Sequence, residues 1–562
     1  MIPPTASIAP GDPRGPAPTP PAPPDPSAGP GSAPGRTGRT GRTGRTGRTD
    51  PGFEAPTRWI AAIVAVIAVA FDVAVHHPVA SLASALLVMV ALAGLLAGGR
   101  IRNRQALVLA GAAALVAAFL ALRTSPWLVP LDVTAALGLT VLAAGYAAGG
   151  SVPSLSGSAL VAHSARAIVA LCLAPAFAIG CASTWIPART DRGRARLLAV
   201  GRGVGLALPV VVVLALLLAS ADAVFASVFA VPDDIGSVAG HIAIVGVGVV
   251  VASALFVAAS GPALEARTVT VTPFGATETT VVLGSIAVLY GVFAAVQVVT
   301  ATGGADHVIE TTGLTYADYA RSGFFQLLAV AALTLAVVCG LRVTTRRESR
   351  SRRIVVAMLG ELVVVLTVVI VGVAINRLAL YDEAFGSTML RLASTVFAWW
   401  LGAVFVLVAI ALAGVGARRR WLTAAVVASG FVALVGWNVM NPEQLVVERN
   451  LARTQEGADL DTAYLWQLSD DAVPAIAAML PALGPDTRGE VLARVCLVPA
   501  PAGYETSYVA PDERTGRPGR PELRGGIAPG AGAPGGPEVD RGLGANRSAT
   551  RAAEVRAQVC RG

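Results

Sequence analysis

Charged residues are scarce in this sequence. Only 14% of its 562 residues are Asp, Glu, Lys or Arg, against roughly 25% in a typical soluble protein. Hydrophobic residues make up 54%, and the mean hydropathy is +0.66. This composition excludes an ordinary soluble globular protein and indicates a polytopic membrane protein. Aromatic residues are also few, at 6%, so Ala, Val, Leu and Gly supply the apolar content. The many glycines have two alternative explanations: close helix packing through small residues, or a high-GC genome.

Motifs of known chemistry are absent as well. There is no phosphate-binding loop, no His-Glu-x-x-His and no Gly-x-Ser-x-Gly, which leaves ATPase, zinc protease and hydrolase functions without support. The histidine pair before Pro78, His76 and His77, lacks a neighbouring carboxylate and is a poor metal-binding pattern. The cysteines have no ligand spacing; they are Cys172, Cys181, Cys339, Cys496 and Cys560. We therefore predict no metal site and no cofactor. Basic loops without interleaved aromatic residues predict no nucleic-acid partner.

The two ends of the chain differ in composition from its middle. Residues 1–57 are rich in Pro, Gly and Arg-Thr-Gly repeats, which predicts a disordered basic cytoplasmic arm that is either simply solvated or bound to anionic lipid. Residues 441–497 predict a small helical extracytoplasmic segment, and residues 498–562, rich in Gly, Pro and Arg, predict a disordered tail. Cys496 and Cys560 would both face an oxidising space, where a disulfide is permitted but not required.

Between these ends the sequence is a series of apolar runs of about 18 to 25 residues, each long enough to cross a hydrocarbon core of about 30 Å. The twelve candidate spans lie near residues 58–75, 79–99, 105–122, 128–149, 159–184, 198–220, 238–260, 279–301, 321–341, 354–376, 393–415 and 421–440.

Arginine clusters predict the orientation of these spans. Clusters in the N-terminal arm and near 100–104, 189–196, 342–353 and 418–420 all favour the cytoplasmic side. Three full spans between the second and third clusters would put one cluster outside. The weakest candidate there contains His163, Arg166 and Pro175, and we interpret it as interfacial or re-entrant. Eleven spans then remain, with the N-terminus in the cytoplasm and the C-terminal tail outside a bacterial inner membrane.

A polar stretch begins the ninth candidate span at its outer end. Thr315 and Asp318 match a helix-capping pattern, which explains both residues. Arg321 is harder to explain, because the positive-inside bias and the helix dipole both disfavour a cation there. Arg377 and Arg391 lie at the outer ends of spans ten and eleven and present the same problem.

We therefore predict an outer cluster of these three arginines with nearby acids. Its members are Arg321, Arg377, Arg391, Asp318, Asp382 and Glu383. The cluster has two interpretations: internal ion pairs that hold spans nine to eleven together, or a site where arginine grips an anionic group such as a lipid phosphate.

Glu361 lies about two turns into span ten from the cytoplasmic side. An ionisable group inside the bilayer is costly, so this residue is a candidate functional acid. Its alternative role is to pair with the adjacent arginines, Arg352 and Arg353.

Four segments, in sequence order, carry a family resemblance: GLTYADYARSGFFQLLAVAALTLAV, NRLALYDEAFGSTMLRL, NPEQLVVERNLAR and LDTAYLWQLSDDAVPAI. Together they resemble a family of bacterial multi-pass membrane proteins known only as a domain of unknown function, number forty-one seventy-three. The resemblance is clearest over residues 200–480. It implies a helical polytopic fold and an inner-membrane location, and no catalytic residues.

The sequence thus predicts an all-α polytopic bundle of about 11 to 12 spans with a disordered N-terminal arm and a small helical tail. We expect a non-enzymatic protein of envelope maintenance or signalling whose outer cluster binds an anionic headgroup or a partner. Membrane lipids are the predicted partners. The alternatives are a secondary transporter and a lipid-linked glycosyl or phosphoryl transferase, for which the loop at 306–318 is the candidate source of carboxylates.

Overall fold

The computed structural model describes residues 57–147, 152, 155, 157–184, 233–260, 275–299, 324–344, 350–414, 421–497, 505–509, 520–524 and 542–560. The chain divides into two units, Met1–Gly52 and Phe53–Gly562, and all described residues belong to the second. The predicted N-terminal arm up to residue 56, the candidate span at 198–220 and the polar stretch with Asp318 and Arg321 lie outside the described residues.

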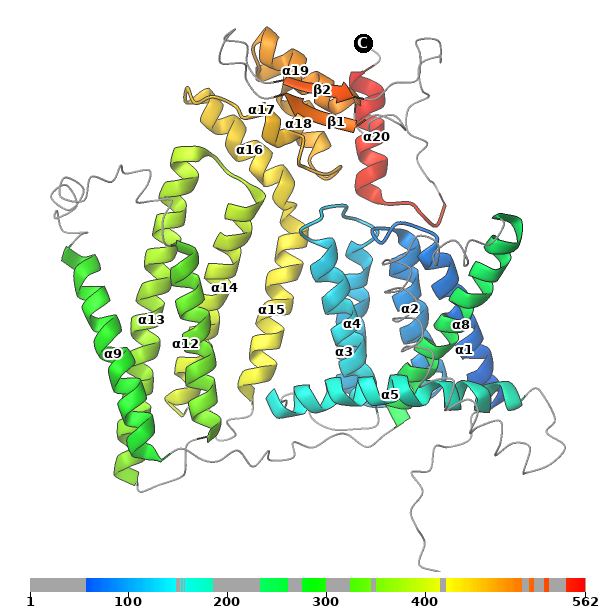
Figure 1. The fold of residues 1–562 in the computed structure, drawn as a ribbon, viewed down its shortest axis with the longest axis horizontal. Helices are drawn as coiled ribbons and strands as arrows, with labels where there is room; N and C mark the ends of the chain where they lie inside the picture. Colours follow the sequence, from blue (N-terminus) through cyan, green and yellow to red (C-terminus); the bar gives the residue numbers. More distant parts are fainter. Residues whose placement is uncertain are drawn as a thin grey trace, which may run out of the picture. The chain divides into compact units, whose positions relative to one another are not determined.

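A first group of helices shares one apolar core (Figure 1). Its members are α1 (Arg58–Val75), α2 (Leu82–Ala97), α3 (Arg104–Phe119), α4 (Val129–Gly145), α5 (Gly157–Ser183) and α8 (Asp233–Ser260). Thr57, Ser81 and Asn103 cap α1, α2 and α3 by accepting a backbone N–H at the start of each helix. Small side chains such as Ala68 and Ala113, both fully buried, let the helices approach closely.

A second group of helices is organised around another core. It comprises α9 (Ala276–Val299), α12 (Phe324–Thr344), α13 (Arg350–Phe385), α14 (Met389–Leu412) and α15 (Trp421–Met440). Phe405 is fully buried at its centre. Helix α15 joins the two groups, because Phe431 and Leu434 pack against the first core and Leu422 against the second.

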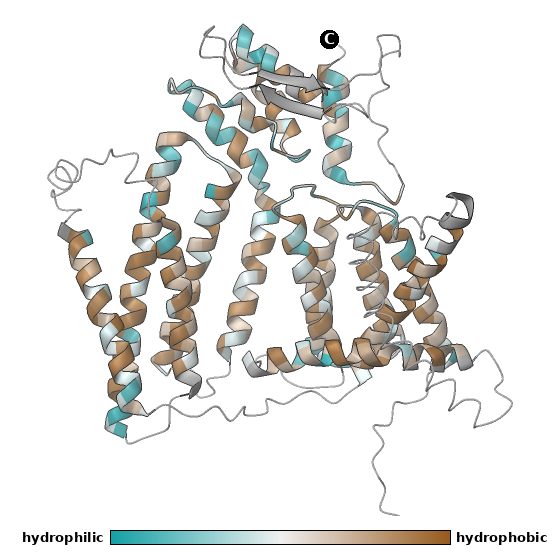
Figure 2. Ribbon diagram, viewed as in Figure 1, coloured by the Kyte–Doolittle hydropathy of each residue, from teal (hydrophilic) through white to brown (hydrophobic). Residues whose placement is uncertain are grey.

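The prediction of an all-α polytopic fold is confirmed. Among the described residues, 8 helices are long and apolar enough to cross a membrane, and α2, α3 and α4 are shorter apolar helices of 16, 16 and 17 residues. Except near 198–220, every candidate span coincides with one of these helices. Figure 2 shows hydrophobic residues along both groups, whereas hydrophilic residues are concentrated beyond the end of α15.

Helix α5 lies across the ends of its neighbours, although its length and composition would allow it to span (Figure 1). Near its start, the His163 ring packs against the tilted ring of Tyr146, just after the end of α4, with the ring centres 4.8 Å apart. Further along, Phe177 is 6.4 Å from Phe256 near the end of α8. After its last turn, the Thr184 carbonyl accepts a hydrogen bond of 3.2 Å from the first residue of α1. We call this the inner end of the helices; that α5 is interfacial or re-entrant stays a prediction.

Helices at the opposite end, which we call the outer end, follow directly from α15. Asn441 adopts a left-handed φ of 49° and Pro442 begins the next helix, so the chain changes direction between α15 and α16. The helices are α16 (Pro442–Gln455), α17 (Thr462–Leu465), α18 (Val473–Met479), the 3₁₀ turn η3 (Leu480–Ala482) and α19 (Pro485–Leu497). Their core includes Met389 and Leu392 of α14, which joins them to the second group.

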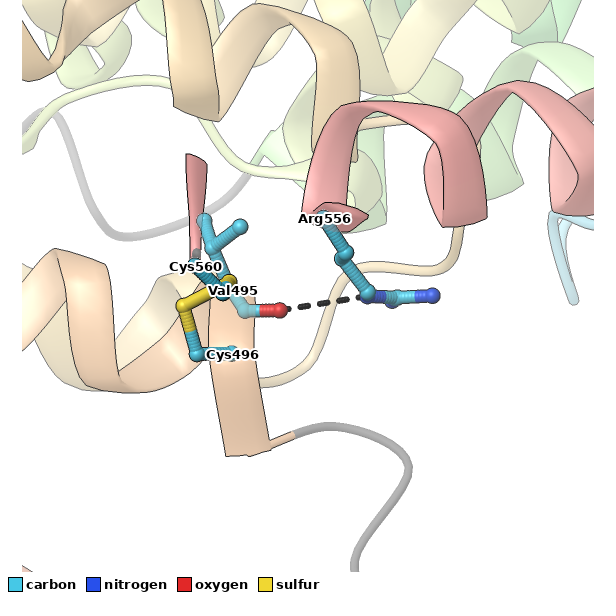
Figure 3. The surroundings of a disulfide bond; sticks show 4 residues. All are labelled: Val495, Cys496, Arg556 and Cys560. Carbon is cyan, nitrogen blue, oxygen red and sulfur yellow. Dashed lines mark hydrogen bonds between the residues drawn. A yellow bond between two sulfur atoms is a disulfide. The ribbon is translucent and has the colours of Figure 1, made fainter. Parts of the chain in front are cut away.

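The structure corrects the prediction that residues 498–562 form only a disordered tail. Strands β1 (Glu505–Val509) and β2 (Arg520–Arg524) pair antiparallel, and α20 (Arg547–Val559) packs against α18 and α19. A disulfide joins Cys496 to Cys560 (Figure 3). The buried Arg556 donates to the Val495 carbonyl at 3.1 Å and to Asp470 at 2.6 Å.

Asn546 fixes the start of α20 against the outer end of the first group. Its side-chain NH₂ lies within hydrogen-bond distance of the carbonyl oxygens of Leu120, Arg123 and Ala80, at 3.0, 2.9 and 3.3 Å. Its oxygen accepts the Ser548 amide at 2.9 Å and caps α20. One buried side chain therefore satisfies the carbonyls that end α3 and begins the last helix.

Candidate functional site

The turn between α13 and α14 separates two residues of the predicted outer cluster, Asp382 and Arg391. Gly386 has a φ of +82°, which only glycine adopts readily, and its N–H donates to the Asp382 carbonyl at 2.8 Å. Thr388 then caps α14, since its hydroxyl accepts the Arg391 N–H at 3.4 Å. Local sequence thus places Asp382 and Arg391 on either side of one tight turn.

Helices of the outer end hold this turn in place. Asn450 of α16 accepts the Ser387 N–H at 2.7 Å and donates to the Ser387 carbonyl at 2.9 Å. The hydroxyl of Tyr464 accepts the Met389 N–H at 2.6 Å. Burial is the main cause of a raised pKa at Tyr464, so the phenol stays neutral. The turn is therefore part of the interface between the membrane helices and the outer helices.

Arg391 is held by neutral groups. Its guanidinium lies 4.1 Å from the centre of the Tyr381 ring, a cation–π arrangement, and donates to the Gly386 carbonyl. Within the described part of the chain it forms no ion pair. A cation in the first turn of a helix is also disfavoured by the helix dipole. Arg391 therefore has a charge that the described residues leave uncompensated.

The acids of the predicted cluster face other partners. The carboxylate of Asp382 accepts the Ser387 hydroxyl at 2.7 Å and lies 3.8 Å from the guanidinium of Arg449 in α16. Glu383 is exposed. The ion pair between Asp382 and Arg449 connects α13 to α16. Arg449 was not among the predicted residues of the cluster.

Arg377 is half-buried one turn before Tyr381, on the same face of α13. Arg321 and Asp318 lie outside the described residues. Whether the arginines and acids form an anion site or a set of ion pairs stays a prediction.

An apolar groove lies close to Arg391. It has a volume of about 330 Å³ and is formed by α12, α14 and the residue Trp127; its other lining residues are Phe325, Leu328, Ala329, Ala332, Leu390, Ala393, Ser394 and Phe397. Tyr381, which stacks on Arg391, is 6.2 Å from Phe324, and Phe324 is 4.0 Å from Phe325 in the groove wall. The cation and the groove are thus separated by a short row of aromatic rings.

Glu361 lies eleven residues after the start of α13, towards the inner end. Among the described residues its Oε1 atom is buried without a hydrogen-bond partner. Its role as an intramembrane acid on a transport path stays a prediction, which transport measurements on Glu361→Gln would test.

Sequence reasoning missed a buried polar contact between the two groups of helices. Asp132 in α4 and Asn438 in α15 are both fully buried, and the Asn438 amide donates to Asp132 at 2.8 Å. Arg123 donates to the Asn438 carbonyl at 2.5 Å. The residues lie 306 positions apart, so no local pattern could have paired them. The available signal was an acid inside the fourth candidate span.

Two further buried acids, both in the outer helices, accept hydrogen bonds near this contact. Asp471 is 2% exposed and accepts the backbone N–H groups of Thr124, at 3.1 and 3.2 Å, and of Ser125, at 3.0 Å. Glu443 is 1% exposed and accepts the N–H and hydroxyl of Ser469 at 2.7 and 2.8 Å. Together they hold the outer helices against the loop between α3 and α4. Burial is the main cause of a raised pKa at Glu443, against the lowering effect of the serine hydrogen bonds.

This pKa shift predicts a pH dependence of stability. An acid whose folded-state pKa is raised stabilises the folded state most below its ordinary value of 4.5, and this contribution is lost as the pH rises through the raised pKa. We expect the unfolding temperature of the wild type to fall relative to that of Glu443→Gln as the pH is raised across that window. Thermal unfolding of both proteins at several pH values measures it; a difference independent of pH would contradict the assignment.

A family model describes this fold. The model of DUF4153, a domain of unknown function, matches residues 110–479, about two thirds of the chain. The chain belongs to the DUF4153 family. The resemblance to a multi-pass membrane family of unknown function is therefore confirmed, with the number 4153 in place of the one given above. No curated protein and no solved structure matches the chain. The apolar helices indicate an integral membrane protein, and DUF4153 membership assigns no activity.

Proposed function

We propose that this DUF4153 protein is a non-enzymatic protein of the bacterial inner membrane, in envelope maintenance or signalling, that binds an anionic phospholipid at its outer end. Arg391 grips the phosphate, Arg377 lies on the same side, and an acyl chain occupies the groove between α12 and α14. The arginine clusters in the loops favour a cytoplasmic inner end and an extracytoplasmic outer end, so the lipid belongs to the outer leaflet.

The charge of Arg391 is the observation that carries this proposal. Its described contacts are a ring face and a carbonyl oxygen, both neutral, so the guanidinium retains donors for an anion. Phosphate oxygens match the planar fork of a guanidinium and accept charge-assisted hydrogen bonds.

The groove supports a lipid over a free anion. It is lined almost entirely by apolar side chains and lies one row of aromatic rings from Arg391. Tyrosine, as at Tyr381, is typical of the headgroup region of a membrane. A phospholipid satisfies both features at once, whereas a soluble anion would leave the groove empty.

Arg391→Ala tests the proposal. A charge-assisted hydrogen bond contributes about 1.5 to 3 kcal/mol, so we expect the variant to retain anionic lipid about tenfold less than the wild type. Native mass spectrometry of the purified protein, titrated with phosphatidylglycerol, measures the occupancy. Arg391→Lys, which keeps the charge without the fork, should be intermediate.

Arg449→Ala is the matched control, because it removes an arginine at the same end that is ion-paired with Asp382. It should retain lipid at the wild-type level. Wild-type lipid occupancy in Arg391→Ala would contradict the proposal, and a loss of membrane abundance without a change in lipid per molecule would assign Arg391 a purely structural role.

A further inference from the structure

We propose that Asp72, His76 and His241 form a binding site for one divalent transition-metal ion, with Zn²⁺ the ion that suits the donors best. The site lies at the outer end of α1 and α8, apart from Arg391 and the groove. We predicted no metal site from the sequence because we missed Asp72, one helical turn before His76, and because His241 is 169 positions from Asp72.

The three side chains already converge. Their ligand atoms, one from each residue, all lie within 4.8 Å of one another. The Nδ1 atom of His241 is 2.9 Å from one oxygen of Asp72, and the Nδ1 atom of His76 is 3.7 Å from the other. In a tetrahedral Zn²⁺ site with bonds of about 2.0 to 2.2 Å, neighbouring ligand atoms are about 3.3 to 3.5 Å apart. Small side-chain rotations would therefore complete the site.

Helix geometry presents these ligands together. Asp72 and His76 are four residues apart at the end of α1, so both lie on one helix face. Gly248 brings α8 against that face, because an added Cβ there would lie only 2.9 Å from the backbone of Ala68. Ala68 precedes Asp72 by one turn, and His241 precedes Gly248 by two. The close approach of the two helices thus directs His241 towards Asp72.

The donor set is that of a transition-metal site. Two imidazoles and a carboxylate are ligands that Zn²⁺ takes in proteins, and three protein ligands leave a fourth position for water. The imidazole rings stack at 4.2 Å with an angle of 22° between their planes. Nδ1 of His76 also lies 2.7 Å from the Asp72 carbonyl oxygen; a proton donated there leaves Nε2 as the His76 ligand atom, and the contact orients the ring as outer contacts orient metal-binding histidines.

Exposure is consistent with exchange of an ion with the surroundings. The side chains of His76 and His241 are 42% and 52% exposed, whereas Asp72 is 15% exposed. An ion there would connect α1 to α8 a few residues along the chain before Leu82 and Ala83, which hydrogen-bond to residues 543–545. The bound ion would thus stabilise the first group of helices at its outer end.

Zinc binding by the full-length protein tests this inference. The protein, purified in detergent and stripped with EDTA, is dialysed against increasing Zn²⁺, and bound metal is measured by mass spectrometry. We expect one Zn²⁺ per chain bound at these three residues, and a rise in unfolding temperature when the ion binds. Asp72→Asn and His241→Ala should each weaken this binding at least about tenfold and abolish the rise in unfolding temperature.

His77→Ala is the matched control, because it removes the neighbouring histidine whose ring is not part of the cluster. It should bind Zn²⁺ like the wild type. Asp72→Asn keeps the shape of the side chain and a hydrogen-bond acceptor for His241, so the variant retains the local contact without the carboxylate. Absence of stoichiometric Zn²⁺ on the wild type, or equal binding by wild type, Asp72→Asn and His241→Ala, would overturn the proposal.

Discussion

Asp471→Ala should release the outer helices from the membrane helices. The carboxylate is almost fully buried and accepts the N–H groups of Thr124 and Ser125. Hydrogen bonds to a charged group contribute about 1.5 to 3 kcal/mol each, and the two N–H groups, of which that of Ser125 is buried, would lose their acceptor, so we expect a loss of about 3 to 5 kcal/mol of docking free energy. Limited proteolysis at the exposed residues 455–457 measures the release as faster cleavage.

Two control variants test whether the lost carboxylate of Asp471 causes the faster cleavage. Asp471→Asn retains one acceptor oxygen and should cost less than the alanine variant. Asp459→Ala removes an exposed acid from the neighbouring loop and should leave the cleavage rate unchanged. If Asp471→Ala were cleaved at the wild-type rate, the contact with the loop between α3 and α4 would not hold the outer helices.

Cys560→Ser should destabilise the packing of α20 on α19. The disulfide to Cys496 closes a loop of 64 residues, and cross-links of this kind stabilise proteins by about 2 to 4 kcal/mol. We expect thermal unfolding of the outer helices to begin at lower temperature, with the same result for Cys496→Ser and for the double variant, since each removes the same bond.

Cys172→Ser is the control for a change in thiol content, because Cys172 is exposed and free in α5. It should unfold like the wild type. If Cys560→Ser matched the wild type while the double variant did not, the effect would come from the side chains and not from the bond.

The membrane helices could be predicted from the sequence because their signal is local. Each is an uninterrupted apolar run, and a helix is the structure that satisfies its backbone inside a membrane without partners. The sequence also marks α5 as different from its neighbours, since His163, Arg166 and Pro175 make it the least suitable span. In the structure His163 is buried against Tyr146 near the inner ends of the helices.

The C-terminal helix was missed because its surroundings dominate the composition. Gly and Pro are abundant around residues 498–545, and α20 itself is short and polar, with Ala552 and Val555 among its few apolar contacts. Its position depends on distant groups: Asn546 bonds to carbonyls more than 400 residues earlier, and Cys560 pairs with Cys496. Amino-acid composition carries no information about contacts between residues so far apart in the sequence.

The candidate sites show the same limit. Arg391 was predictable as an anomaly, because the positive-inside bias disfavours a cation at the predicted outer end of a span. Its neutral environment was not, since Tyr381 and Gly386 are identified as partners only when the turn folds. The Asp72 and His241 pair and the Asp132 and Asn438 pair join separate helices, and side chains so far apart in sequence meet only through packing.

The side of the membrane on which the outer helices lie decides the leaflet of the proposed lipid and the compartment of the proposed metal. An enzyme reporter that is active only outside the cytoplasm, fused after Gly562 of the intact chain, measures it directly. We expect strong reporter activity at this position and none for the same reporter fused before Met1. Activity at Met1 and none after Gly562 would contradict the orientation, and with it the outer-leaflet lipid site.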